Sequence, residues 1–202
     1  MSKMITKWKV LFQVALFALV IAVSSCKQQS AAEDTKKVAE EANEENLEAK
    51  DSVNDAMEKD SDYLIAAAET NLMQIELGKL AMSKSTNTSI KDLAKMMIDQ
   101  HIKASEKLNP LAASKQVVLP MALTDKGKDK YENLNKKSGK DFDDAYVDMM
   151  VNGHEDAISK IKDASEDAKD ADIRAWAAAM LPTLNTHLQD SKTLRDQIKK
   201  TK

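Results

Sequence analysis

Apolar residues spaced alternately four and three positions apart are the feature that most constrains how this chain can fold. Over residues 89–115 the series is Ile90, Ala94, Met97, His101, Ala104 and Leu108. Two later segments carry similar series, first Val147, Met150, His154, Ile158 and Ile161, and then Ile173, Ala177, Met180, Leu184, His187, Ser191, Leu194 and Ile198. Such spacing places the residues on one face of a helix that packs against other helices.

Breaks in this pattern predict where the helices begin and end. We expect helices over residues 63–84, 89–115 and 140–168 and from residue 172 onward, with capping residues at 61–62 and 85–88. Short turns join the first helix to the second and the third to the fourth, whereas residues 121–138 form a longer polar connection with room for a short helix. The pattern predicts an all-α fold, a four-helix bundle, with one crossover if that connection spans the bundle.

The composition excludes several classes of protein. One cysteine rules out a disulfide scaffold and cysteine-rich zinc or iron–sulfur sites, and the four glycines form no phosphate-binding loop motif. A net charge of −3 lacks the basic footprint of a nucleic-acid-binding protein, so we expect no nucleic-acid partner.

Residues 1–25 resemble a bacterial lipoprotein signal peptide. Lysines precede an apolar stretch over residues 10–23, which is shorter than the roughly 20 residues of a membrane-spanning helix. The sequence VSSC at 23–26 fits the pattern in which the cysteine becomes the lipidated first residue of the mature protein. We therefore expect Cys26 to anchor the protein to a membrane. Because Lys27 and not an aspartate follows it, we expect the outer membrane, with the protein facing the periplasm or the cell surface.

The segment after the cysteine is strongly acidic. Between Lys27 and Asp62 there are twelve acidic residues, five lysines and no aromatic residue. Such a segment buries little apolar surface to offset its ordering entropy. We predict that residues 26–60 are a disordered or loosely helical tether and that residues 61–202 form the folded domain.

All three histidines of the chain lie on the apolar faces of different predicted helices. His101, His154 and His187 each fall near the middle of their helix, so in a bundle they meet at the same depth. Imidazole is a ligand for zinc, iron and copper, and the pattern predicts a single metal ion of this kind. Without a metal, the same histidines would form a buried polar network.

The first helix offers three candidates for a further ligand. Glu76 is chemically the best ligand, and it lies seven residues from Glu69 on one face, together with Lys79. Gln74 lies on the opposite face at the depth that best matches the histidines. The residues three before the histidines are Ile98, Val151 and Leu184, which excludes the Glu-x-x-His pattern of di-iron centres; a non-covalent haem held by histidine remains open.

Five segments together resemble a family of ferritin-like, exported bacterial proteins grouped as domain of unknown function 4142. They are IELGKLA at 75–81, MIDQH at 97–101, SGKDFD at 138–143, YVDMMVNGHE at 146–155, and LPTL at 181–184 followed by HL at 187–188. The resemblance implies a ferritin-like bundle over about residues 61–197 and carries the family's histidines onto His101, His154 and His187. In the family an acidic residue commonly stands where this sequence has Gln74. The resemblance implies no activity.

These features favour a lipoprotein that binds a transition metal over an enzyme, since no nucleophile and base can be paired in the sequence. An envelope-stress or protein-interaction module with structural histidines and no metal is the alternative. A metalloenzyme with an open ligand position is a third possibility.

Overall fold

The computed structural model describes residues 35–48 and 54–200, and within these ranges the chain forms six helices and no strand. The helices are α1 (Thr35–Glu48), α2 (Asn54–Lys84), α3 (Thr88–Ser114), α4 (Asp125–Asn135), α5 (Gly139–Asp167) and α6 (Ala171–Lys200). The all-α prediction is confirmed for this part of the chain. The predicted signal peptide and Cys26 lie outside the described residues.

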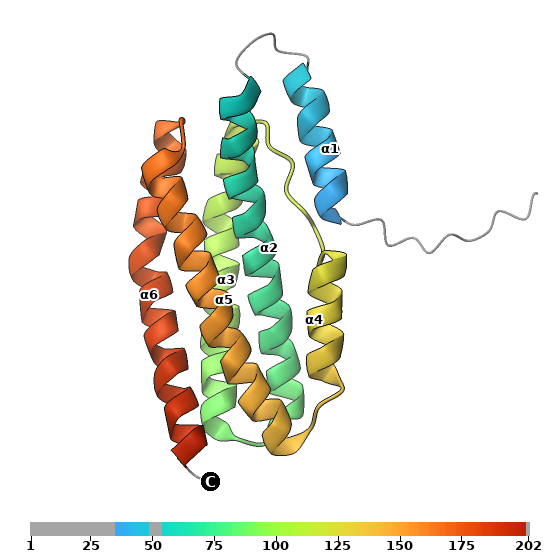
Figure 1. Ribbon diagram of the computed structural model, residues 1–202, viewed down its shortest axis with the longest axis vertical. Coiled ribbons are helices and arrows are strands. Elements are labelled where there is room, and N and C mark those ends of the chain that lie inside the picture. Colours follow the sequence, from blue (N-terminus) through green and yellow to red (C-terminus); the bar gives the residue numbers. More distant parts are fainter. Residues whose placement is uncertain (1–34, 49–53, 201–202) are drawn as a thin grey trace, which may run out of the picture. The chain divides into compact units, whose positions relative to one another are not determined.

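The four long helices pack side by side. Helix α2 contacts α3 and α5, α5 contacts α6, and α3 contacts α6, whereas the shorter α4 lies against α2 and α5. Figure 1 shows the connection between α3 and α5 running back along the length of the helices, with α4 forming its second half. Helices α3 and α5 therefore point in the same direction, as a crossover connection requires.

Side-chain caps define several helix ends close to the predicted positions. The Asn87 carboxamide oxygen accepts hydrogen bonds from the backbone N–H groups of Ser89 and Ile90, at 2.9 and 3.4 Å. The Asp170 carboxylate does the same for Asp172 and Ile173, at 2.8 and 3.2 Å. These acceptors satisfy N–H groups that have no partner within the helix.

Two apolar clusters fill the space between the helices. The first core cluster is formed by Leu77, Leu80, Ala81, Ile90, Leu93, Ala94, Met97, Leu134, Phe142, Tyr146, Val147, Met150, Leu194 and Ile198. The second core cluster is formed by Leu64, Ala67, Ala68, Leu108, Ala112, Ala157, Ile161, Ala164, Ala168, Ile173, Ala177 and Leu184. On each long helix the two clusters occupy opposite halves, and the residues between them form a separate layer.

Helix α1 and the connection after α3 are held together by a buried asparagine. Asn43 donates to the Val118 carbonyl oxygen at 3.1 Å and accepts from the Val118 N–H at 2.7 Å. Ala39, one turn earlier, is also buried. Part of the acidic segment is thus a helix packed on the domain, although the sequence predicts only a tether or a loose helix there.

The predicted cap at Ser61–Asp62, with a helix starting at residue 63, is wrong, because α2 begins earlier, at Asn54. Asp60 instead caps the turn between α5 and α6: its two carboxylate oxygens accept from the N–H groups of Lys169 and Asp170, at 2.8 and 2.7 Å. Asp60 is only 7% exposed. The start of the long helix is therefore coupled to a turn more than a hundred residues away in sequence.

Replacing this aspartate is expected to destabilise the fold. Asp60→Ala leaves two backbone N–H groups without their acceptor, so we expect a loss of about 1–3 kcal/mol in the free energy of unfolding, measured by urea denaturation. Asp62→Ala is the matched control, because burial and the nearby Glu40 raise the pKa of Asp62 and disfavour its charge. Equal losses in the two variants would contradict the capping role of Asp60.

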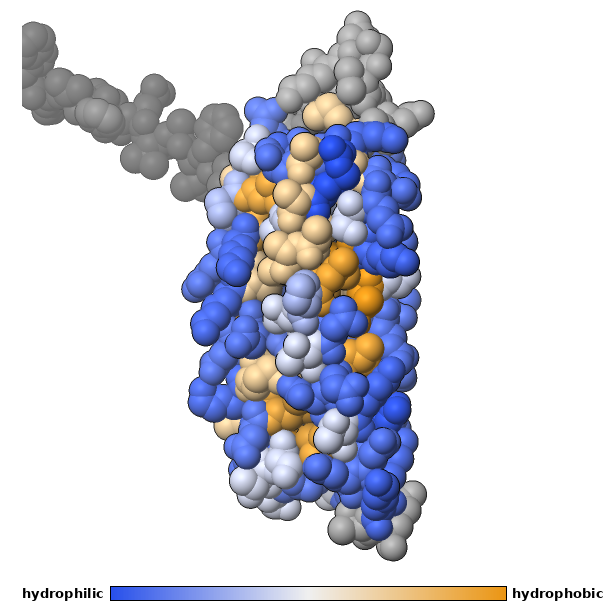
Figure 2. Space-filling view, turned by 90° about the vertical axis from the view of Figure 1, so that its left-hand side faces the viewer, coloured by the Kyte–Doolittle hydropathy of each residue, from blue (hydrophilic) through white to orange (hydrophobic). Residues whose placement is uncertain are grey.

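The outward faces of the helices are polar. Figure 2 shows hydrophilic residues covering most of the face in view, with hydrophobic residues in a strip down its middle that is interrupted in the lower half. Among the described residues, no helix combines the length and the apolar character needed to cross a membrane.

Candidate metal centre

The three histidines lie in the layer between the two core clusters. His101 of α3, His154 of α5 and His187 of α6 are 1%, 0% and 3% exposed. On its own helix, each histidine lies between residues of the first core cluster and residues of the second core cluster. The heptad spacing that buries the apolar residues therefore buries the imidazoles at one depth, as the sequence predicts.

One ring nitrogen from each histidine lies within 4.8 Å of the others, and we call this group the histidine cluster. The ring centroids are 5.3 to 5.5 Å apart. The Nε2 atoms of His101 and His154 are separated by 3.4 Å. Two nitrogen ligands about 2.0–2.1 Å from a tetrahedral zinc ion lie about 3.3–3.4 Å apart, so this spacing fits a shared ion.

The hydrogen-bond partners of His101 and His154 favour one tautomer of each ring. Nδ1 of His154 lies 2.7 Å from the Met150 carbonyl oxygen, which can only accept, so this Nδ1 carries the proton and donates. Nδ1 of His101 lies 2.9 Å from Oδ1 of Asn71, which also accepts. In the neutral rings the two Nε2 atoms therefore face one another with their lone pairs. In these tautomers no N–H group lies between the two Nε2 atoms. A cation placed there would interact favourably with both lone pairs.

Burial favours the neutral form of all three imidazoles in the histidine cluster. Burial, followed by the charges of His154 and His187, lowers the pKa of His101 well below its usual value. Burial lowers the pKa of His154, against an opposing effect of its hydrogen bond to Met150. Burial and the charge of His154 lower the pKa of His187 to about 4. Unprotonated imidazole is the form that binds a metal ion.

The two carboxylates predicted as ligands on the first helix, Glu76 and Glu69, do not lie at the histidine cluster. The Glu76 carboxylate pairs with Lys79 Nζ at 2.7 Å and is 38% exposed, because it lies on the outward face of α2. Among the described residues, no aspartate, glutamate or cysteine completes a group with the three histidines. Glu76 and Glu69, the carboxylates predicted on the first helix, therefore lie outside this group of three histidines.

Gln74 is buried as predicted, at 2% exposure. Its Nε2 atom lies 2.9 Å from the place where a Cβ on Gly153 would stand, so the absence of a side chain at Gly153 makes room for the amide. Its Oε1 atom is buried and has no hydrogen-bond partner among the described residues. Gln74 therefore lies beside the residue that precedes His154, with one oxygen unpaired.

Asn71 is the residue of α2 that sequence reasoning missed. It is 6% exposed, and it orients His101 through the Nδ1 hydrogen bond. Asn71 and His101 lie at equal distances in sequence from Thr86, in the turn between α2 and α3. Two residues at equal distances from the turn between α2 and α3 lie at the same depth, which pairs Asn71 with His101. The sequence interpretation measured the depth of each residue from the end of its own helix, and this selected Gln74.

Comparison with known proteins identifies one family. The sequence model of a family described as "Domain of unknown function (DUF4142)" matches residues 43–194. This range includes all three histidines and Asn71. No curated protein and no solved structure matches the chain.

Proposed function

The chain belongs to the DUF4142 family, whose description assigns no function, and we propose that it binds one divalent transition metal ion through His101, His154 and His187. The observation that carries the proposal is the 3.4 Å approach of the Nε2 atoms of His101 and His154 in a buried layer. The Nδ1 atom of each ring lies beside an oxygen acceptor. If either ring carried its proton on Nε2 instead, the hydrogen bond from Nδ1 to that oxygen would be lost. A bound cation gives each lone pair a partner.

The donor set favours a borderline metal ion. Neutral imidazole is a good ligand for zinc, iron and copper, and three histidines with a fourth position for water or another ligand are a known zinc arrangement. The hydrogen bonds from His101 to Asn71 and from His154 to Met150 hold the rings in orientation, which supports metal affinity in such sites. When bound, the ion would supply a Lewis-acidic centre in a largely apolar surrounding.

The same proposal includes a ferritin-like four-helix bundle. Bundles of this kind have one long crossover and build metal sites from side chains on facing helices. The connection after α3 and the inward histidines of α3, α5 and α6 support this assignment.

We also propose that the protein is a lipoprotein. In this proposal residues 1–25 are a signal peptide, Cys26 is lipidated, and residues 26–60 link the anchor to the domain. The support is the sequence VSSC at 23–26 after a short apolar stretch. The metal site would then lie on the outer membrane, facing the periplasm or the cell surface.

Zinc titration of the full chain, without a histidine tag, tests the metal proposal. We expect one zinc ion per chain, with Asn71→Ala weakening the affinity about 10–100-fold because His101 loses its orienting acceptor. Asn71→Asp, which keeps an acceptor oxygen, should retain most of the affinity. Competition with a chromophoric chelator measures the affinities, and circular dichroism verifies that each variant is folded.

Glu76→Gln is the control for this titration. Its side chain lies on the outward face of α2, so zinc affinity and stoichiometry should not change. A folded wild-type chain that binds no zinc, copper or iron would contradict the proposal. A loss of zinc binding in Glu76→Gln would indicate that Glu76 is a metal ligand, as the sequence suggested.

A further inference from the structure

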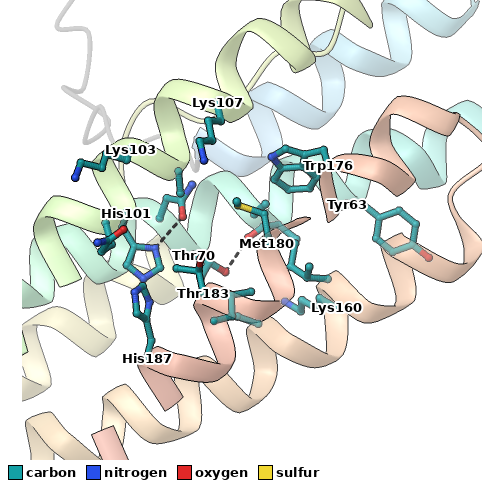
Figure 3. Close-up of a pocket in the computed structure, with 18 of the residues that line it drawn as sticks. Tyr63, Thr70, His101, Lys103, Lys107, Lys160, Trp176, Met180, Thr183 and His187 are labelled. Atoms are coloured by element: carbon teal, nitrogen blue, oxygen red, sulfur yellow. Dashed lines mark hydrogen bonds between the residues drawn. The ribbon is translucent and has the colours of Figure 1, made fainter. Parts of the chain in front are cut away.

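A cavity of about 270 Å³ opens beside the histidine cluster. Its lining includes His101 and His187, so it reaches two of the three proposed ligands. In Figure 3 these histidines lie at one end of the lining, and Tyr63 and Trp176 lie at the other. The volume is slightly below the roughly 300–1,000 Å³ of pockets for drug-sized ligands, which suits a small molecule.

The walls of the cavity are largely apolar. Helices α2, α3, α5 and α6 contribute Ala67, Ala104, Ala157, Met180 and Leu184. Small alanine side chains leave the space open, and the flexible methionine can adapt to a ligand. An apolar chain would lose its contact with water here, which is favourable.

The charged residues of the lining are mainly basic. Lys103 and Lys107 of α3 and Lys160 of α5 line the cavity, together with one carboxylate, Glu106. None of the three lysines forms an ion pair with a described residue, whereas Lys95 and Lys192 elsewhere on the surface are paired. In Figure 3 the lysines come from opposite sides of the cavity. The electrostatic environment therefore favours an anion over a cation.

We propose that this cavity binds a small carboxylate with an apolar chain, and that its carboxylate group occupies the open coordination position of the metal ion. The proposal rests on the proposed function, because it needs the ion at the histidine cluster. Among the described residues no carboxylate or thiolate fills that position, and the cavity gives access to it. The apolar chain lies along the alanine and methionine walls, and the lysines at the rim attract the anion.

Fluorescence of Trp176, which lines the cavity, reports on binding. The chain contains two tryptophans, so Trp8→Phe leaves Trp176 as the single emitter. Octanoate is added to the zinc-loaded full chain with this substitution, and octylammonium, which has the same chain length and the opposite charge, is added to a parallel sample. We expect a saturable change with octanoate alone, and binding about tenfold weaker to the zinc-free protein.

Two sets of variants locate the binding site. Replacing Lys103, Lys107 and Lys160 together by glutamine should weaken octanoate binding. The same replacement of Lys91, Lys126 and Lys137, which do not line the cavity, should have no effect. Ala104→Phe fills the cavity from α3 and should abolish binding while zinc is still held.

The outcomes separate this inference from the proposed function. A zinc-loaded chain without a saturable response to octanoate, or with an equal response to octylammonium, overturns the inference and leaves the metal proposal intact. If the chain binds octanoate but takes up no zinc, two ideas are overturned: the metal proposal, and the proposal that the carboxylate coordinates the metal ion. Equal weakening by both lysine triples also overturns the inference.

Discussion

Saturating zinc should raise the melting temperature of the full chain by about 10 °C, and replacing His154 should remove this increase. A ligand present at about a thousand times its Kd stabilises the folded state by about 4 kcal/mol, which corresponds to a shift of this size in a domain of this length. His154 is fully buried, and its Nε2 faces that of His101, so its loss removes a ligand that no other described side chain is placed to replace.

The comparison uses the difference between zinc-loaded and zinc-free samples of each variant. His154→Ala also leaves a cavity, which lowers the melting temperature of the zinc-free protein. Because the zinc-loaded sample of the same variant has this cavity too, the difference between the two samples does not include its effect. His154→Gln fills more of the space and serves as the second variant if the alanine variant does not fold. Glu76→Gln should show the full increase. An equal increase in wild type and in both His154 variants would contradict the role of the histidine cluster.

The stability of the metal-free protein should fall steeply as the pH drops below about 6.5. The pKa values of all three histidines are lowered in the folded state, that of His187 to about 4. The unfolded chain therefore takes up protons first as the pH falls. The contribution of the neutral rings to stability is fully present above about pH 6.5 and is lost progressively toward about pH 4.

The expected size of this effect is large. A histidine that is protonated only in the unfolded state costs about 1.4 kcal/mol for each pH unit below its unfolded pKa, and the pKa of His187, lowered to about 4, gives it this behaviour. Urea denaturation in the presence of a chelator measures it. A variant with all three histidines changed to leucine should lose most of the pH dependence. In the unaltered protein, the NMR signals of the three imidazoles should titrate below the usual range for histidine, and ordinary titration near pH 6.5 would contradict the buried neutral state.

The positions of the histidines could be predicted because one pattern determines both the helix face and the depth. In α3 the spacing from Ile90 to Leu108 places His101 on the buried face, and five of the six residues in that series are buried in the structure. The exception, Ala104, lines the cavity beside the histidine cluster. A regular heptad pattern contains no signal for such an opening.

The start of the domain was harder to predict because long-range contacts determine it. Asp60 lies in a stretch that is acidic and poor in apolar residues, yet its carboxylate caps the turn at Lys169 and Asp170. Likewise, Asn43 pairs with the backbone of Val118. No local pattern links residues so far apart in sequence, so composition alone suggested a tether.

The choice of residue on α2 depended on helix rotation and register. Glu76 is the better metal ligand by chemistry, but its neighbour Lys79 marks an outward face, and the two form an ion pair there. Asn71 faces inward and contacts His101. A difference of a few residues along a helix changes the face on which a side chain lies, so ligand chemistry alone does not identify the residue of α2 that contacts a histidine.

X-ray absorption at the zinc edge of the zinc-loaded full chain tests the central claim most directly. We predict three imidazole ligands and one further light-atom ligand at about 2.0–2.1 Å, with one imidazole lost in His154→Gln. A shell of oxygen ligands with fewer than two imidazoles, or an unchanged spectrum in His154→Gln, would contradict a metal ion held by His101, His154 and His187.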